Sequence, residues 1–375
     1  MKLFRKNHII NILEKYSQSE APLDLFLHHY FKSNRSIGSH DRKEIAETVY
    51  AYTRNQALIR HQSSPNIRDQ VEWLCANDLE AAQHRSGIPD HVRVSFPKEY
   101  FMLLEQSLGL SSAIEFCKSS NAKAPVTIRA NTHKIQRDAL LLRLSDRFHC
   151  TANPYSSWGI DVHGQAVLFQ TPEFAEGLFE MQDAASQLAA QLVEAKPHDA
   201  VLDFCCGAGG KTLAFAPQME GKGQIYIHDV REHALQEAKK RLKRAGIQNY
   251  QILDRESAYF HQKKRQMDWV LVDAPCSGSG TLRRNPDQKW RFKRSSIDEL
   301  VVLQRTIFAQ ALQFLKPNGK IVYATCSVLK EENKEQVDFF CENHHLQLVK
   351  PFFEVITSSS GMDGFFAAVM EIKKP

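Results

Sequence analysis

The spacing of hydrophobic and polar residues changes character twice along the 375-residue chain. In residues 1–122 apolar side chains recur every three or four positions, as Ile45, Val49 and Tyr52 do, which predicts amphipathic helices. From Ala200 onward, short apolar runs alternate with helical patterns, which is typical of a mostly parallel sheet. We therefore expect a multidomain protein with an N-terminal all-α domain and a C-terminal α/β Rossmann-like domain.

Residues 123–180 combine both kinds of pattern. The apolar runs 125–129 and 166–169 predict two strands, and the spacing over 134–144 predicts a helix between them. Another helix is expected to open at 182–188. We accordingly predict an all-α domain at 1–122, a small α+β linking module at 123–180 and the α/β domain at 181–375.

Buried strands are expected in the last domain wherever an unbroken apolar run ends in a polar or glycine-rich segment. The predicted strands are residues 200–204, 224–229, 250–254, 269–272 and 321–324, with a late strand at 365–370. In a doubly wound fold the carboxyl ends of parallel strands meet at one edge, where ligands bind. The residues that follow these strands are therefore the candidates for chemistry.

The first of these strands runs into Cys205, Cys206, Gly207, Ala208, Gly209, Gly210 and Lys211. Glycines lack a Cβ atom and let the backbone approach a ligand closely. A P-loop would need a glycine where Cys205 stands, so that interpretation fails. Asp229 ends the next strand and is placed to accept both ribose hydroxyls, while Asp254 ends the third and can meet an adenine amino group. Helix capping is the alternative for each aspartate, but together with the loop they predict an adenosine-bearing cofactor.

Two cysteines follow the next two strands. Cys276 lies in Asp273-Ala274-Pro275-Cys276, and Cys326 follows Thr325. A thiol with an ordinary pKa of about 8.5 supplies a usable thiolate, which makes cysteine an effective nucleophile. Buried structural thiols are the alternative, and that interpretation is preferred for Cys117 and Cys341 inside helical stretches. For the strand-end pair we favour covalent chemistry.

The segment 283–294 is rich in basic and aromatic side chains. It carries six basic residues against one acid, with Trp290 and Phe292 between them. Such groups suit phosphates and unstacked bases, and a solvated basic loop is the alternative. The candidate RNA-binding residues are Arg283, Arg284, Lys289, Trp290 and Arg291.

Composition adds limits rather than a function. A net charge of +5 is only mildly basic. Eight cysteines without a Cys-X-X-Cys pair favour a reduced, cytoplasmic protein without a structural zinc site. No window approaches the roughly 20 apolar residues of a membrane span. The first ten residues lack a continuous apolar core, so we expect no signal peptide. We expect a monomer that binds no metal.

The C-terminal half resembles the Fmu/Sun family of RNA 5-methylcytosine methyltransferases over about residues 125–375. The resemblance rests on ordered motifs, namely Gln182 to Ser186, Asp203 to Thr212, Asp229, Asp254, Asp273 to Asp287, Thr325 to Ser327 with Glu331 to Asn333, and Asp363 to Phe366. It implies that residues 205–211 together with Asp229, Asp254 and Asp273 bind S-adenosylmethionine. It also implies that Cys326 is the nucleophile, that Cys276 assists product release and that Asp273 hydrogen-bonds the pyrimidine.

The match is not complete. Family members usually carry Cys-Ala-Ala-Pro-Gly-Gly-Lys where this chain has Cys-Cys-Gly-Ala-Gly-Gly-Lys, and loss of the proline softens the loop. The N-terminal domain is similar to the NusB-like RNA-binding domain of the bacterial 16S ribosomal RNA members, on Arg35 to Gly38 and Asp41-Arg42. Scaffolding is the alternative role for it.

The resemblance implies methylation of cytosine C5, with 16S ribosomal RNA as the expected substrate. Transfer RNA is the alternative substrate. A ribosome assembly factor that binds RNA without catalysis is the alternative outside enzymes.

Overall fold

The computed structural model describes residues 1–164, 166–357 and 361–373. The chain divides into two compact units, which we call the helical unit and the sheet unit. The helical unit is Met1–Ala124 with Thr281–Arg294, and the sheet unit is Pro125–Gly280 with Ser295–Pro375. The break after Ala124 lies close to the predicted boundary at 122. No pattern in the sequence indicated that 281–294 packs with the N-terminal helices, and the predicted three-domain division stays a prediction.

The helical unit is built from amphipathic helices, as expected for the N-terminal region. They are α1 (Leu3–Tyr16), α2 (Leu23–Ser33), α3 (Ser39–Arg54), α4 (Gln56–Gln62), α5 (Ile67–Ala76), α6 (Leu79–Gln83), α7 (Asp90–Arg93), α8 (Lys98–Leu108) and α9 (Leu110–Asn121), with the 3-10 helix η4 (Gln288–Arg291). Positions three and four apart point into one core, where Ile9, Leu13, Ile45 and Val49 are buried. Burial of this apolar stripe stabilises helices that would be marginal in isolation. The likeness to NusB stays a prediction.

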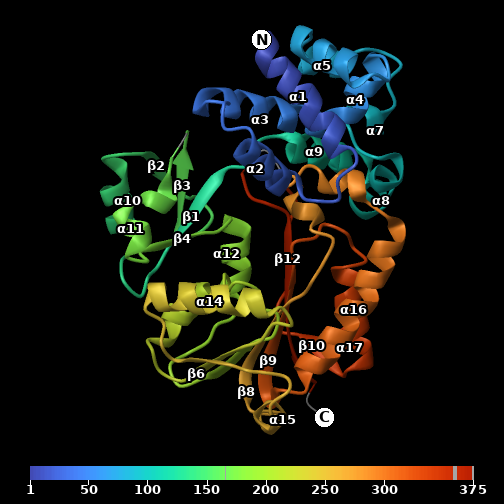
Figure 1. The fold of residues 1–375 in the computed structure, drawn as a ribbon. Helices are drawn as coiled ribbons and strands as arrows, with labels where there is room; N and C mark the ends of the chain where they lie inside the picture. The colour runs from blue at the N-terminus through green and yellow to red at the C-terminus, as the bar shows by residue number, and fades with distance from the viewer. Residues whose placement is uncertain (165, 358–360, 374–375) are drawn as a thin grey trace. The chain divides into compact units, whose positions relative to one another are not determined.

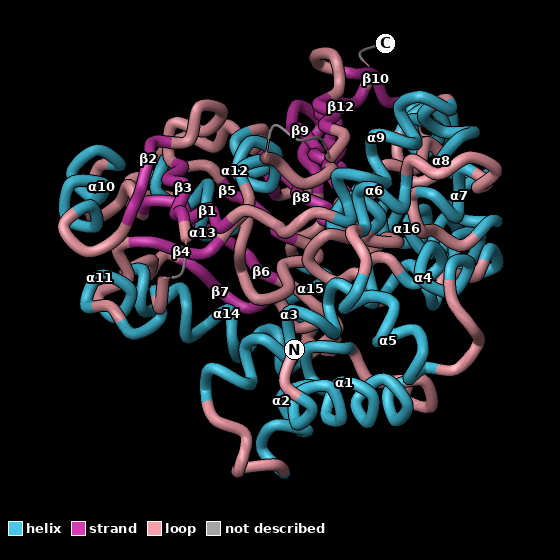
Figure 2. Tube along the Cα trace, turned by 90° about the horizontal axis from the view of Figure 1, so that it is seen from above, coloured by secondary structure: helices cyan, strands magenta, loops and turns pink. Residues whose placement is uncertain are grey.

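A small antiparallel sheet opens the sheet unit. Its strands are β1 (Val126–Ala130), β2 (His149–Ala152), β3 (Gly159–His163) and β4 (Phe179–Met181), in the order β2-β3-β1-β4 (Figure 2). Helix α10 (Arg137–Ser145) packs Leu140 and Leu144 against Ile128 and Phe179. The predicted strand at 125–129 and helix at 134–144 are therefore confirmed, with small shifts of their ends.

The strand predicted at 166–169 is wrong. Residues Leu168–Gln170 form the 3-10 helix η1, followed by α11 (Pro172–Ala175), whose first turn is capped by Thr171. Leu168 is buried, but Val167 and Phe169 are 62% and 65% exposed. A run with one buried apolar side chain gains little from joining a sheet. The capping residue Thr171 and the following Pro172 therefore favour helical turns here.

The large sheet carries the strand ends that the sequence singled out. Its strands are β5 (Ala200–Asp203), β6 (Gln224–Ile227), β7 (Tyr250–Ile252), β8 (Met267–Asp273), β9 (Leu315–Thr325), β10 (Leu346–Leu348), β11 (Phe353–Val355) and β12 (Phe365–Ile372). The order is β10-β12-β9-β8-β5-β6-β7, and β11 pairs with β12. Strands β5 to β9 pair in parallel, while β12 is antiparallel to β9. The mostly parallel sheet is confirmed.

Helices cover both faces of this sheet (Figure 1). Along β8, Val270 and Val272 face the core shared with α16 (Arg294–Leu312) and α17 (Lys334–Asn343). Trp269 and Leu271 face the core shared with α14 (Glu232–Ala245). This alternation explains the unbroken apolar runs, because a strand buried on both faces has no polar side.

The strand order reverses at β5, with β6 and β7 on one side and β8 and β9 on the other. In open α/β sheets a crevice forms at this switch point, outside the carboxyl ends of the strands. The residues after β5 and β8 therefore lie where such folds bind ligands. No helix within the described residues is both long and apolar enough to cross a membrane.

Candidate active site

Residues 205–211, the glycine loop, connect β5 to helix α13 (Thr212–Phe215). Gly207 and Gly209 have φ angles of +52° and +77°, which side chains with a Cβ rarely adopt. A Cβ on Gly209 would lie 3.3 Å from the Cβ of Ala238, whereas one on Gly210 would meet nothing within 4 Å. The loop thus packs against α14 through Gly209 and leaves open space beside Gly210.

Asp229, just after β6, holds this loop by its backbone. Its Oδ2 accepts the N–H of Gly207 at 2.8 Å, and its carboxylate also accepts the backbone N–H and guanidinium of Arg231. Burial opposes ionisation, but these hydrogen bonds hold the pKa of Asp229 below its usual value. The lowered pKa favours a charged acceptor where the ribose is expected.

Asp203 ends β5 and lies beneath the glycine loop. Its Oδ2 accepts the Thr212 hydroxyl at 2.6 Å, whereas Oδ1 has no hydrogen-bond partner. Complete burial raises the pKa of this carboxyl to about 7. The sequence motif included Asp203, but no role had been assigned to it.

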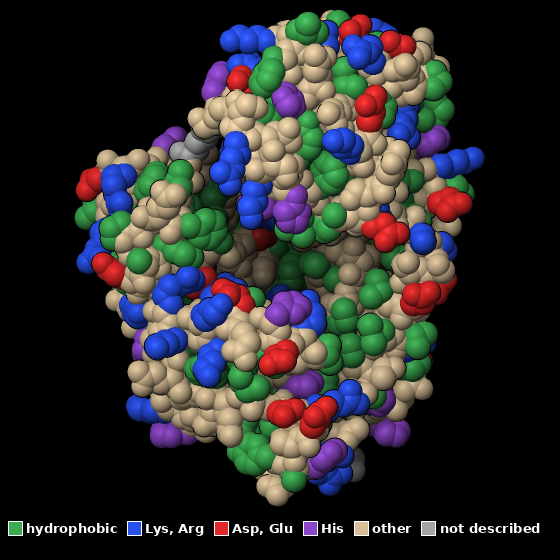
Figure 3. All heavy atoms as spheres, in the orientation of Figure 1, with side chains coloured by type: hydrophobic (Ala, Val, Ile, Leu, Met, Phe, Trp, Pro, Cys, Tyr) green, Lys and Arg blue, Asp and Glu red, His purple; other side chains and the backbone are tan. Residues whose placement is uncertain are grey.

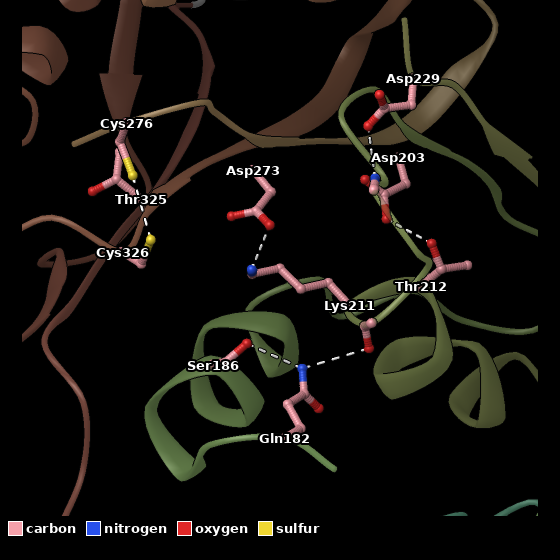
Figure 4. A network of polar contacts seen from close by, with 12 residues as sticks. Gln182, Ser186, Asp203, Lys211, Thr212, Asp229, Asp273, Cys276, Thr325 and Cys326 are labelled. Carbon is pink, nitrogen blue, oxygen red and sulfur yellow. Dashed lines mark hydrogen bonds and ion pairs between the residues drawn. The ribbon is translucent and has the colours of Figure 1, made fainter. Parts of the chain in front are cut away.

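Lys211 joins the glycine loop to the end of β8 (Figure 4). Its ammonium donates to Asp273 Oδ2 at 2.6 Å and lies 4.7 Å from the centre of the Phe365 ring. Asp273 is partly exposed, whereas Lys211 is buried, so the carboxylate is the member of the ion pair that solvent can reach. The two predicted residues are brought together as expected of one site.

The two strand-end cysteines also meet. The sulfur atoms of Cys276 and Cys326 are 3.4 Å apart, on neighbouring strands β8 and β9 (Figure 4). The hydrogen bond from Cys276 lowers the pKa of Cys326 and raises that of Cys276. Burial and the Asp273 carboxylate oppose the first shift, while the Lys211 ammonium supports it. The geometry therefore favours a thiolate at Cys326 and a thiol at Cys276.

The remaining predicted cofactor residues differ in environment. Burial raises the pKa of both Cys205 and Cys206, so these thiols stay protonated and contribute chiefly backbone to the loop. Asp254 is exposed, and its Oδ1 accepts the backbone N–H of Glu256 in the turn that leads toward α15 (Ala258–Gln262). Contact of Asp254 with a cofactor stays a prediction.

Sequence reasoning missed Arg129 and gave Gln182 no role. The buried guanidinium of Arg129, on β1, donates to the Gly210 carbonyl at 2.9 Å and also to the side chain of Gln182. Gln182 in turn donates to the Ser186 hydroxyl. The small sheet thereby braces the glycine loop. The one available signal was an arginine inside an otherwise apolar strand.

The basic–aromatic segment 283–294 belongs to the helical unit. Lys289 is 1% exposed, and its ammonium donates to the carbonyl of Arg54 and to Asn121 Oδ1. Trp290 donates its indole N–H to the Thr53 carbonyl at 2.7 Å. These two side chains have partners inside the unit, and a role in RNA binding was predicted for them.

The other three predicted RNA-binding residues have different surroundings from those of Lys289 and Trp290. Arg291 donates to the carbonyls of Glu20 and Ala21. Arg283 is buried, yet it lines an open hollow of about 450 Å³ together with Arg284, Tyr50, Arg54 and Lys123. Their contact with RNA stays a prediction.

A doubly wound sheet with a glycine loop and a charged acidic side chain after β6 defines a Rossmann-like fold with a site for a nucleotide-type cofactor. A model of the family described as 16S rRNA methyltransferase RsmB/F matches residues 190–370. The ribosomal RNA small subunit methyltransferase B of Vibrio cholerae is 31% identical over 82% of this chain and 73% of its own length. A mouse 28S rRNA (cytosine-C(5))-methyltransferase is 32% identical over 64% of this chain and 31% of its own.

Among solved structures, a methyltransferase homologue from Pyrococcus horikoshii superposes with a TM-score of 0.67 at 27% identity. The superposition covers 76% of this chain and 98% of the archaeal one. The chain spans 59% to 73% of the lengths of three bacterial small-subunit relatives. The chain belongs to the 16S rRNA methyltransferase RsmB/F family. It is a methyltransferase that uses S-adenosylmethionine.

Proposed function

We propose that this chain methylates C5 of a cytosine in small-subunit ribosomal RNA through a covalent bond between Cys326 and C6 of the base. The observation that carries the proposal is the pair of thiols 3.4 Å apart at two adjacent strand ends. The name of the mouse relative, which specifies cytosine C5, and the bacterial relatives, which are named for the small-subunit RNA, support the substrate.

Cys326 begins the reaction because C5 of cytosine is a poor nucleophile. The Cys326 thiolate adds to C6, a C6–S bond forms, and the electron pair of the C5–C6 double bond becomes available at C5. Asp273 hydrogen-bonds the pyrimidine in this proposal and favours its protonated ring. After C5 has gained the methyl group, a base removes the C5 proton. The C6–S bond then breaks, which restores the double bond and the thiolate.

Cys276 is assigned to the release step. Its thiol lies beside Cys326, and its raised pKa keeps it protonated while Cys326 is charged. It can thus stabilise the leaving thiolate by donating a hydrogen bond to it. Its hydrogen bond also favours the Cys326 thiolate, but Cys276 forms no bond to the base during attack and methyl transfer.

The residues present fit S-adenosylmethionine, which supplies an electrophilic methyl group when bound. The space beside Gly210 is open. Near the same loop, Oδ1 of Asp203 has no hydrogen-bond partner. The backbone of 205–211 and the charged Asp229 would hold the adenosine end, and Asp273 borders the thiols. Binding of the ribose by Asp229 requires the Arg231 guanidinium to give up part of its contact. Calorimetric titration should show weaker S-adenosylmethionine binding by Asp229→Ala, and an unchanged affinity would remove this assignment.

We further propose that the helical unit docks RNA. A hollow of about 550 Å³ is lined by His28, Phe31, Lys32, Arg35 and Arg42, none of them acidic. Lys, Arg and His side chains gather over α2 on the face shown in Figure 3. Cations suit phosphates, and the ring of Phe31 suits an unstacked base.

Filter binding across a salt series tests the docking role. Lys32→Ala with Arg35→Ala should weaken RNA binding and reduce the salt dependence by about 0.7 per lost phosphate contact. Arg68→Ala, which removes an exposed arginine of α5, serves as the control. Unchanged affinity and slope in the double variant would leave the unit a scaffold.

The substrate itself is tested by bisulfite sequencing of ribosomal and transfer RNA from a deletion strain. Loss of one 5-methylcytosine from the small-subunit RNA supports the proposal. Loss from transfer RNA alone would move the activity to that substrate, and no loss would favour a non-catalytic assembly factor. We also propose a reducing, cytoplasmic setting, since all eight cysteines are free, and a monomer, since one chain supplies both thiols and the cofactor loop.

A further inference from the structure

A buried carboxylate joins the two cysteine loops. Glu332 lies between β9 and α17 and is completely buried. Its Oε1 accepts the backbone N–H of Ser277 at 2.9 Å and the side-chain amide of Gln304 at 3.0 Å. Its Oε2 accepts the hydroxyls of Ser277 and Ser327, each at 2.5 Å.

These partners are the immediate neighbours of the reactive residues. Ser277 follows Cys276, and Ser327 follows Cys326. Gln304, from α16, also donates to the carbonyl of Pro275, on the other side of Cys276. One carboxylate and one amide therefore fix the backbone on both sides of the first thiol, and the carboxylate holds the side chain next to the second.

The carboxylate is saturated. Four donors occupy the four lone-pair positions of Glu332, so no position remains for substrate or for proton transfer. Its own backbone is held as well, because Tyr323 donates its hydroxyl to the Glu332 carbonyl at 2.8 Å. A buried carboxylate is costly to leave without hydrogen bonds. Its four donors are therefore held in place, and Glu332 affects the thiols by fixing the positions of their neighbours.

We propose that Glu332 is a positioning residue that sets the separation of the Cys276 and Cys326 sulfur atoms by tying together the two loops that carry them. The proposal rests on the function proposed above, in which both thiols take part. Its effect on the sulfur atoms can nevertheless be measured without any turnover.

Two substitutions separate geometry from charge. Glu332→Ala removes all four acceptor positions and leaves the buried donors of both loops unpaired. Glu332→Gln keeps one acceptor oxygen for Ser277 and Gln304, and its amide group can donate to the two serine hydroxyls, which also accept hydrogen bonds. The tie therefore survives in Glu332→Gln, although the charge is lost.

The test is the rate at which a short bifunctional thiol reagent bridges Cys276 and Cys326, followed by mass spectrometry of the linked peptides. Wild type, Glu332→Gln and the control Glu335→Ala, an exposed acid of α17, should bridge at similar rates. Glu332→Ala should bridge about tenfold more slowly, because several hydrogen bonds that hold the loops are lost. Circular dichroism establishes that each variant is folded. Ser277→Ala, which removes one hydroxyl from the tie, provides an intermediate rate if Glu332→Ala fails to fold.

Bridging by Glu332→Ala, or by Ser277→Ala in its place, at the wild-type rate would overturn the proposal. Methyl transfer measured in parallel separates the two claims. Slow bridging with full methyl transfer supports the tie but contradicts the thiol mechanism. Full bridging with lost methyl transfer contradicts the positioning role and leaves the thiol mechanism intact.

Discussion

The loop at Cys276 and the segment Thr281–Arg294 both follow strand β8, and Thr281 lies five positions after Cys276. Both carry residue types that suggested direct contact with RNA. The first contributes a thiol to the sheet unit, where it faces Cys326. The second carries the basic and aromatic side chains into the helical unit.

The two regions differ in what their functional groups already contact. Glu332 holds Ser277 and Ser327, the residues that follow the two cysteines, whereas each sulfur has the other as its partner. In the segment, the ammonium of Lys289 has two oxygen acceptors and two aromatic rings, those of Phe96 and Trp290. The thiols keep a reactive atom for chemistry, whereas the ammonium of Lys289 already has acceptors inside the helical unit.

The same comparison shows that composition alone does not distinguish internal packing from RNA binding. Phe292 stacks on Tyr100 with ring centres 4.3 Å apart, much as it would stack on a base. Cations and aromatic faces attract one another inside a protein through the same forces that attract them to nucleic acid. The number of internal partners separates the two roles, and that number comes only from the fold.

The largest expected effect belongs to the thiol site. Cys326→Ala removes the nucleophile and should lower methyl transfer by at least about 10³-fold, because no bond to C6 can form. Folding and S-adenosylmethionine binding should survive. Tritium transfer to RNA measures the loss, with Cys341→Ala, a half-buried thiol of α17, as the control. Full transfer by Cys326→Ala would make the thiol structural.

The next effect concerns the ionisation of Cys326. Cys276 donates a hydrogen bond that favours the Cys326 thiolate and lowers its pKa. Cys276→Ala removes the donor, so the midpoint of Cys326 alkylation should move to higher pH by about one unit. Cys276→Ser retains a donor, so its alkylation midpoint should lie between those of the wild type and Cys276→Ala. Iodoacetamide labelling across pH provides the measurement, and a downward shift in Cys276→Ala would contradict the assigned roles.

In the segment Thr281–Arg294, we expect substitution of Lys289 to lower the free energy of unfolding without affecting RNA binding. Lys289→Met keeps the apolar stem but leaves the Arg54 carbonyl and Asn121 Oδ1 without their donor, at a cost of about 1–3 kcal/mol. Urea unfolding measures the loss, and Lys293→Met, at an exposed lysine of the same segment, is the control. Below the unfolding transition, RNA affinity should stay within about twofold of wild type. If Lys289→Met is as stable as the wild type but binds RNA more weakly, Lys289 contacts RNA.

Lys289 also gives a dependence on pH. Burial holds its pKa well below the usual value, so the unfolded chain binds this proton more tightly than the folded chain does. The free energy of unfolding should therefore rise with pH between the folded pKa and about 10.5, the value for an unburied lysine. The rise should be absent from Lys289→Met. Equal slopes in the two proteins would show that the ammonium is not buried.

The sequence predicts what local patterns encode. Apolar runs located β5, β6, β8, β9 and β12, and parallel pairing then brought Lys211 to Asp273 and Cys276 to Cys326. The contacts that the sequence did not predict share one cause, which is that they join residues distant in the chain. Arg129 reaches Gly210 across 81 positions, and Lys289 reaches Arg54 across 235. The local spacing of apolar and polar residues does not identify either partner. The incorrect strand predicted at 166–169 shows that this spacing can also give a wrong element.

The assignment of Cys326 as nucleophile and Cys276 as the residue of release is tested most directly by the site of covalent attachment. Cys276→Ala, incubated with ribosomal RNA and S-adenosylmethionine, should accumulate a protein–RNA conjugate that survives denaturing electrophoresis. Mass spectrometry of the digested conjugate should place the methylated base on the peptide that contains Cys326, and the double variant with Cys326→Ala should form none. A conjugate on Cys276 in Cys326→Ala, with none in Cys276→Ala, would contradict the account.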